Sequence, residues 1–125
     1  MQPTWILVAD GARARLFSPG VDGTSFIELE DFVDPDGRNA IQPHTNPEAK
    51  ITDRFARELS DVLERGRIDH RYERLILAAP PRFLGILQRA LGKQTHACVV
   101  AHLDKDLTRL PASEILARLA PQLAN

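Results

Sequence analysis

Asp10 is the acidic residue best placed to do chemistry, because it directly follows a short apolar run. Enzymes that cleave phosphodiesters with two metal ions hold those ions with clustered carboxylates. Glu48 or Glu58 could supply a second carboxylate, but residues 77–80 (Leu-Ala-Ala-Pro), which end a later apolar run, contain none. The pattern therefore argues against a metal-dependent nuclease. It favours a simpler role for Asp10 in an Asp-Gly hairpin turn with Gly11.

The corner formed by Pro80, Pro81 and Arg82 is a candidate anion site. Free backbone N–H groups at the start of a helix, together with a guanidinium, attract groups such as phosphate. In an open α/β sheet, ligands bind beyond the carboxyl ends of the strands, and we expect Asp10 and Arg82 to face that crevice. The alternative is that these groups only cap the helix and form a surface salt bridge.

Arg13 and Arg15 are two residues apart in a predicted strand, so their side chains should project from one face. With Arg82 or Lys105 nearby, they would form a cationic cluster able to contact RNA phosphates. The simpler interpretation is a solvated charged face.

The four histidines, His44, His70, His96 and His102, lack the paired spacing of metal ligands, and the single cysteine, Cys98, lies in an apolar run. We therefore expect neither a metal nor another cofactor, and a packed, unreactive thiol. The sequence also lacks a Gly-rich phosphate loop and the signature of a covalent nucleophile, so no catalytic residue is predicted. His44 is the histidine most available for function because it lies in a long polar loop.

The elements that must position these residues follow from hydrophobic periodicity and turn signals. Residues 5–9 and 14–17 predict a hairpin, and the alternation in residues 25–33 predicts a third strand with one packed face. Residues 34–47 contain three prolines and predict an exposed loop. Helical spacing of apolar residues predicts a helix over residues 48–65, ended by Gly66.

The second half of the chain predicts strands that alternate with helices. Residues 74–79 and 96–103 have the continuous apolar character of strands covered on both faces. Between them, Pro80 and Pro81 open a helix with an apolar stripe, and Gly92 is expected to end it; residues 112–119 predict a last helix. The order β-β-β-α-β-α-β-α is best satisfied by an α/β fold with a mixed five-stranded sheet, helices on its faces and a ribonuclease H-like arrangement.

Composition bounds the function more loosely. A chain of 125 residues with 43% hydrophobic and 26% charged residues is typical of one globular domain, here residues 1–125. The net charge of -1 argues against a uniformly basic nucleic-acid binder. The N-terminal residues have no basic segment followed by a long apolar one, so we expect a cytoplasmic protein without a membrane partner.

Three runs, WILVADGARARLF (residues 5–17), AAPPRFLG (78–85) and KDLT (105–108), resemble the bacterial family called host attachment protein, or protein required for attachment to host cells. Gly37, Arg38, Asn39 and the segment around Phe55 and Ala56 extend the likeness over nearly the whole chain. This family is thought to be similar to the central domain of archaeal and eukaryotic peptide release factors, which implies a ribonuclease H-like fold and a link to the ribosome. Those domains use a Gly-Gly-Gln motif, whereas the corresponding loop here reads GRNAIQP (residues 37–43), with a lone Gln42.

The leading hypothesis is therefore a non-catalytic binding domain that contacts ribosomal or transfer RNA through Arg13, Arg15, Arg82 and Lys105. The enzymatic alternative is a hydrolase centred on Asp10, His44 and Arg82. A third class is a protein-interaction factor that affects attachment to cells indirectly. The sequence does not predict an oligomeric state.

Overall fold

The computed structural model describes residues 3–20, 26–33 and 47–123. Its five strands form one mixed sheet in the order β3-β2-β1-β4-β5. The first three strands pair antiparallel, and β1, β4 and β5 run parallel. The predicted α/β class with a mixed five-stranded sheet is confirmed. The strands are β1 (Thr4–Ala9), β2 (Arg13–Pro19), β3 (Phe26–Val33), β4 (Arg74–Ala78) and β5 (Val99–Leu103).

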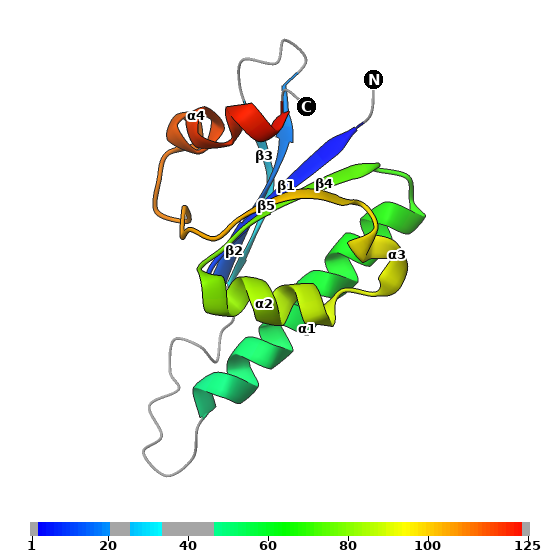
Figure 1. Cartoon of the computed structure of the whole chain (residues 1–125), viewed down its shortest axis with the longest axis vertical. Coiled ribbons are helices and arrows are strands. Elements are labelled where there is room, and N and C mark those ends of the chain that lie inside the picture. Colours follow the sequence, from blue (N-terminus) through cyan, green and yellow to red (C-terminus); the bar gives the residue numbers. More distant parts are fainter. Residues whose placement is uncertain (1–2, 21–25, 34–46, 124–125) are drawn as a thin grey trace.

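The helices cover both faces of this sheet (Figure 1). Long α1 (Pro47–Ile68) and α2 (Pro81–Ala90) pack on one face, and α4 (Ala112–Leu123) packs on the other. A four-residue helix, α3 (Lys93–His96), which the sequence patterns did not predict, leads into β5. No helix in the described ranges combines the length and the apolar character that a membrane span requires.

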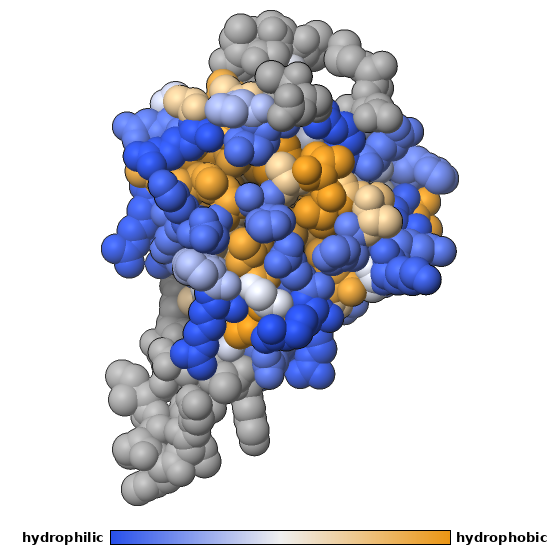
Figure 2. Space-filling model, viewed as in Figure 1, coloured by the Kyte–Doolittle hydropathy of each residue, from blue (hydrophilic) through white to orange (hydrophobic). Residues whose placement is uncertain are grey.

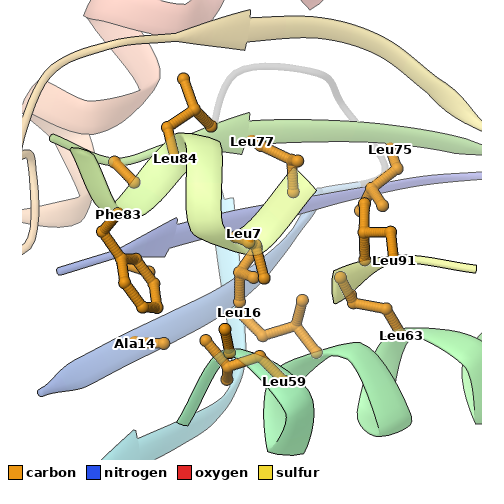
Figure 3. Packing of buried hydrophobic residues seen from close by; sticks show 14 of the residues in the cluster. Leu7, Ala14, Leu16, Leu59, Leu63, Leu75, Leu77, Phe83, Leu84 and Leu91 are labelled. Atoms are coloured by element: carbon orange, nitrogen blue, oxygen red, sulfur yellow. The ribbon is translucent and has the colours of Figure 1, made fainter. Parts of the chain in front are cut away.

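Two buried clusters of side chains hold the layers together. Alternate residues of β1 point to opposite faces, so Leu7 joins the cluster under α1 and α2 and Ile6 joins the cluster under α4. Figure 3 shows the first cluster, in which Leu59 and Leu63 of α1 meet Leu7, Leu16 and the α2 side chains. Every residue of β1 is buried, and so are all residues of β4 after Arg74. The prediction that residues 74–79 form a strand covered on both faces is therefore confirmed.

The end of α1 differs from the prediction. Gly66 was expected to stop the helix, but the helix continues to Ile68. A Cβ atom at Gly66 would lie 2.5 Å from the Trp5 ring, so this glycine allows strand and helix to approach closely. The chain turns instead at His70, which has a φ of 58°, with hydrogen bonds from Arg71 N to Gly66 O (2.8 Å) and from His70 N to Arg67 O (3.1 Å). This is the Schellman arrangement of a helix end, with histidine in the left-handed position that glycine usually takes.

The third strand also departs from the expected simple alternation. Leu16 lies opposite Glu30 and Phe17 lies opposite Glu28, so Leu29 is an extra residue in β3. Such a bulge changes which face the following side chains occupy. Phe26 consequently packs on the α4 face and Phe32 on the α1 face, although both have the same parity in sequence. Because of this bulge, β3 has no single packed face. It is also an edge strand, and most of its residues are exposed.

Four further predictions about the second half are corrected. The last strand begins at Val99, because His96 ends α3, and it alternates between half-buried and exposed residues, as expected for an edge strand. Cys98 lies in the turn before β5 and is only half-buried. Gly92 is the N-cap of α3, since α2 already ends at Ala90. The final helix continues beyond residue 119 to Leu123, with Pro121 in its last turn.

Candidate functional site

The carboxyl ends of the three parallel strands meet at one edge of the sheet, where α2 begins at the lower left of Figure 1. Asp10 follows β1, the Pro80–Arg82 corner follows β4, and Lys105 follows β5. Arg13 begins β2 beside the end of β1, because Ala9 pairs with Ala14. We call this the carboxyl edge. It brings together Asp10, Arg13, Arg82 and Lys105, and Arg15 lies two residues further along β2, opposite Val8. His44, Gln42 and the rest of residues 34–46 lie outside the described residues.

The Asp10 carboxylate is bound into the turn between β1 and β2. Its Oδ1 atom accepts hydrogen bonds from Ala12 N at 2.7 Å and from Arg13 N at 2.8 Å, and its own N–H donates to Arg13 O at 2.9 Å. The other oxygen, Oδ2, lies 3.3 Å from the hydroxyl of Thr108. The turn therefore holds Oδ1 firmly, whereas Oδ2 only lies near the Thr108 hydroxyl, whose single proton has a shorter bond to Asp106 Oδ1 at 2.6 Å. The interpretation of Asp10 as a turn residue is confirmed by these contacts.

Thr108 is a site residue that the sequence analysis missed. It is 5% exposed, and it is the last residue of the KDLT run, residues 105–108. Asp106 Oδ1 accepts hydrogen bonds from Thr108 N at 2.9 Å and from Thr108 Oγ1 at 2.6 Å. The Asp-x-Thr spacing is a signal for such a local side-chain turn. Thr108 thereby connects the loop after β5 to the Asp10 turn.

The Arg15 side chain acts as a clamp between three segments. Its Nε and Nη2 atoms donate to the two carboxylate oxygens of Glu28 at 3.0 and 2.9 Å, and Nη1 donates to the carbonyl oxygens of Thr108 (3.2 Å) and Leu110 (2.6 Å). The guanidinium also lies 5.0 Å from the centre of the Phe17 ring. Arg15 thus joins β2, β3 and the segment before α4, and four of the five N–H donors of its guanidinium are engaged.

The acidic partners of Arg15 have shifted protonation equilibria. Hydrogen bonding to Arg15 lowers the pKa of Glu28 to about 2. Hydrogen bonding to the Glu28 carboxylate raises the pKa of Asp31 to about 6, because two neighbouring carboxyl groups share one proton more easily than they both ionise. The same Glu28 hydrogen bond raises the pKa of Arg15. Sequence reasoning did not select Glu28 or Asp31, because only the pairing of β2 with β3 brings them to Arg15.

Three cations at the carboxyl edge stay exposed: Arg13, Arg82 and Lys105. Arg82 lies in the first turn of α2, which starts with Pro81, contains no acidic residue in that turn and has no side-chain cap. The positive end of the helix dipole therefore adds to the Arg82 charge. Among the described residues, no group of three or more His, Cys, Asp or Glu side chains is arranged to hold a metal ion. Glu58, one of the possible second carboxylates, is exposed on α1.

Comparison with known proteins agrees with this architecture. The family model described as "Protein required for attachment to host cells" matches residues 33–119. No curated protein has significant sequence similarity to the chain.

Among solved structures, the archaeal translation termination factor aRF1 is similar, with a TM-score of 0.56 and 10% identity over 98% of this chain. Dom34 of S. cerevisiae, titled a translation termination-like factor involved in RNA quality control pathways and interacting with Hbs1, has a TM-score of 0.53 and 11% identity over 93% of this chain. A structure titled "Archaeal protein" has a TM-score of 0.52 and 10% identity over 98% of it. This chain spans 39%, 35% and 38% of their lengths, respectively, and at these identities the likeness concerns the fold.

Proposed function

The chain belongs to the family described as protein required for attachment to host cells, and from this premise we propose that it is a non-catalytic cytoplasmic domain that binds ribosomal or transfer RNA. The proposal takes residues 1–125 as one binding domain. Its RNA-binding surface is the carboxyl edge of the sheet, and the binding residues are Arg13, Arg82 and Lys105.

The observation that carries the proposal is the placement of these three exposed cations. Arg13 begins β2, Arg82 follows β4 and Lys105 follows β5. Because β1 lies between β2 and β4 in the sheet, the three cations span four adjacent strands. Neighbouring strands are about 4.8 Å apart, so the outer two cations are separated by roughly 14 Å across the sheet. Within the described ranges, none of the three forms a salt bridge. A row of exposed cations at this spacing suits the phosphates of a nucleic-acid backbone, and Asp104 and Asp106 beside Lys105 lower the positive charge only at its β5 end.

The neighbouring groups support binding more than catalysis. Asp10 would have to supply a free carboxylate to a metal ion or a water molecule, but two turn N–H groups bind its Oδ1 atom, and the Thr108 hydroxyl lies 3.3 Å from its Oδ2 atom. Arg15, which the sequence analysis placed among the RNA-binding residues, is engaged by Glu28 and two carbonyl groups. Arg15 therefore holds β2, β3 and the segment before α4 together, and the RNA contacts come from the other three cations.

The similar solved structures support a link to translation. Two of the three come from proteins titled as translation termination or termination-like factors, and this chain matches a domain-sized part of each. A shared fold does not transfer an activity. It supports the choice of ribosomal or transfer RNA as the nucleic acid to test first.

The test is crosslinking of the native chain to RNA in cells, followed by sequencing of the bound RNA. The triple variant Arg13→Ala, Arg82→Ala, Lys105→Ala should lose enrichment of ribosomal or transfer RNA while keeping the wild-type circular dichroism spectrum. Binding of purified protein to the enriched RNA should weaken with rising salt, because phosphate contacts release counterions.

The matched control is Arg57→Ala, Arg65→Ala, Arg118→Ala, which removes the same charge from exposed helix positions. This control should retain the enriched RNA. An equal loss in both triple variants would show that only net charge matters and would overturn the assignment of the edge. Wild-type protein that enriches no RNA would overturn RNA binding itself and leave the protein-interaction class as the hypothesis to test.

A further inference from the structure

The β5 edge of the sheet differs from the β3 edge in its chemistry. Within the described residues, β3 and β5 are the two outer strands, so each has a row of backbone hydrogen-bonding groups without a neighbouring strand. Natural edge strands are usually protected by charged side chains, by proline, by a β-bulge or by a short length. The β5 strand has only a length of five residues and a bulge at Val100. The β3 strand carries Glu28, Glu30 and Asp31, whereas the five residues of β5 are Val-Val-Ala-His-Leu, with no acid, lysine, arginine or proline.

Four of the five side chains of β5 are apolar, the exception being the exposed His102. Ile76 pairs with Ala101 and Leu75 with Val99, so Val100 is an unpaired extra residue, and it is 49% exposed. Ala101 and Leu103 pack only partly against the cluster under α4. Figure 2 shows apolar surface across the middle of this face, over the strip where Figure 1 places β5 between α4 and α2. An apolar edge strand of this kind is a docking surface or an aggregation site.

The charges at the two ends of β5 indicate what docks there. The short helix that precedes the strand exposes Lys93 and His96, and the segment that follows it exposes Asp104 and Asp106 around Lys105. One end of the edge is therefore cationic, and the other is net anionic. When two β5 strands pair antiparallel, the first end of each lies beside the second end of the other, so the attraction occurs twice.

We propose that β5 is the interface of a homodimer, in which two copies of this chain pair their β5 strands antiparallel about a two-fold axis. The two sheets then form one continuous sheet of ten strands. Such an interface closes on itself, because the same surface is used by both copies. Pairing of β3 with β3 would place acidic side chains opposite one another, and pairing of β5 with β3 would not close. The short strand limits the contact area, so we expect a dissociation constant in the micromolar range.

The test is the mass of the purified full chain by sedimentation velocity between roughly 1 and 300 μM, a range that brackets a micromolar dissociation constant. Wild-type protein should convert from monomer to dimer over this range. Val100→Lys places a charge on the edge without disturbing the core and should weaken the dimer at least tenfold. Ile27→Lys, at a side chain that is 52% exposed on β3, is the matched control and should dimerise like wild type.

Charge-exchange variants test the attraction between the two ends of β5. Lys93→Glu should weaken the dimer, and Lys93→Glu combined with Asp104→Lys should restore it, because the exchanged charges again attract. Wild-type protein that stays monomeric at all concentrations overturns the proposal. A dimer insensitive to Val100→Lys, or growth beyond the dimer that Ile27→Lys abolishes, also overturns it, since the second result indicates head-to-tail pairing of β5 with β3.

Discussion

At the scale of single residues, Arg15 has the strongest set of described polar contacts, and its removal should weaken the fold. Arg15→Met keeps much of the apolar stem but loses the bonds to Glu28, Thr108 and Leu110. Charge-assisted hydrogen bonds contribute roughly 1.5–3 kcal/mol, and with partial solvent screening we expect a loss of about 2 kcal/mol in the free energy of unfolding. Urea denaturation of Arg15→Met and wild type measures this loss. The control Arg13→Met, at an exposed position, should change stability by less than about 0.5 kcal/mol, and equal losses would contradict the clamp.

The acid pair beside Arg15 predicts a particular pH dependence. The pKa of Asp31 is raised from its ordinary value of 3.8 to about 6, so its contribution to stability is fully present below pH 3.8 and is lost as the pH rises through 6. The pKa of Glu28 is lowered from 4.5 to about 2, so its contribution is present above pH 4.5 and is lost as the pH falls toward 2. Asp31→Asn should therefore remove a decline in stability between pH 4 and 6.

Thermal unfolding midpoints measured from pH 3.5 to 7.5 would show this decline in wild type and its absence in Asp31→Asn. Carboxyl carbon NMR should report a midpoint near pH 6 for Asp31. Glu30→Gln, which removes the adjacent acid on the other face of β3, is the control and should keep the decline. An Asp31 resonance that titrates near pH 4 would exclude proton sharing with Glu28.

At the scale of the elements, two helical glycines should respond oppositely to alanine. A Cβ at Gly66 would meet the Trp5 ring at 2.5 Å, whereas a Cβ at Gly85 of α2 would meet only the end of Arg89, at 3.7 Å. Overpacking costs about 1–3 kcal/mol, and alanine gains about 1 kcal/mol over glycine in a helix. Gly66→Ala should therefore destabilise by up to about 2 kcal/mol, and Gly85→Ala should stabilise by about 0.5–1 kcal/mol. Chemical denaturation of both variants measures the two changes in the free energy of unfolding. Stabilisation by Gly66→Ala would contradict the close contact with Trp5.

The elements that sequence patterns predicted well are those whose signal is local and long. The apolar periodicity of α1 and the continuous apolar run of β4 gave the correct element type. The errors came from contacts distant in sequence. In the sequence, Gly66 has the pattern of a helix stop, and only the structure shows that Trp5 lies against it. The bulge at Leu29 depends on the pairing of β3 with β2. The exposure of β5 depends on its place at the edge of the sheet.

At the scale of the whole molecule, the candidate site was likewise predicted where it depends on local sequence and missed where it depends on contacts distant in sequence. The fold order placed Asp10 and Arg82 at one edge, because parallel strands end together, and in the structure both follow parallel strands there, with Lys105 beside them after β5. The turn at Asp10 was also predictable from its neighbours. The clamp at Arg15 was not, because Glu28 and the carbonyl of Leu110 reach it from segments 13 and 95 residues away.

The two buried clusters share one sheet, and this predicts that the described parts of the chain unfold as one unit. Leu59→Ala opens a cavity in the cluster under α1, and Leu119→Ala opens one in the cluster under α4; both leucines are almost fully buried. Each variant should lose about 3 kcal/mol of the free energy of unfolding. Domains below 150 residues usually unfold in one cooperative transition, so damage on either face should shift the same transition.

Two probes test this prediction in urea. Fluorescence of Trp5, the single tryptophan, reports on the cluster under α1, and far-ultraviolet circular dichroism reports on all helices, including α4. The midpoints from both probes should coincide in wild type and in both variants, and Leu29→Ala, at an exposed leucine, should behave nearly as wild type. If circular dichroism fell before fluorescence in Leu119→Ala alone, α4 and its face would be a separately melting layer, and residues 1–125 would not behave as one cooperative domain.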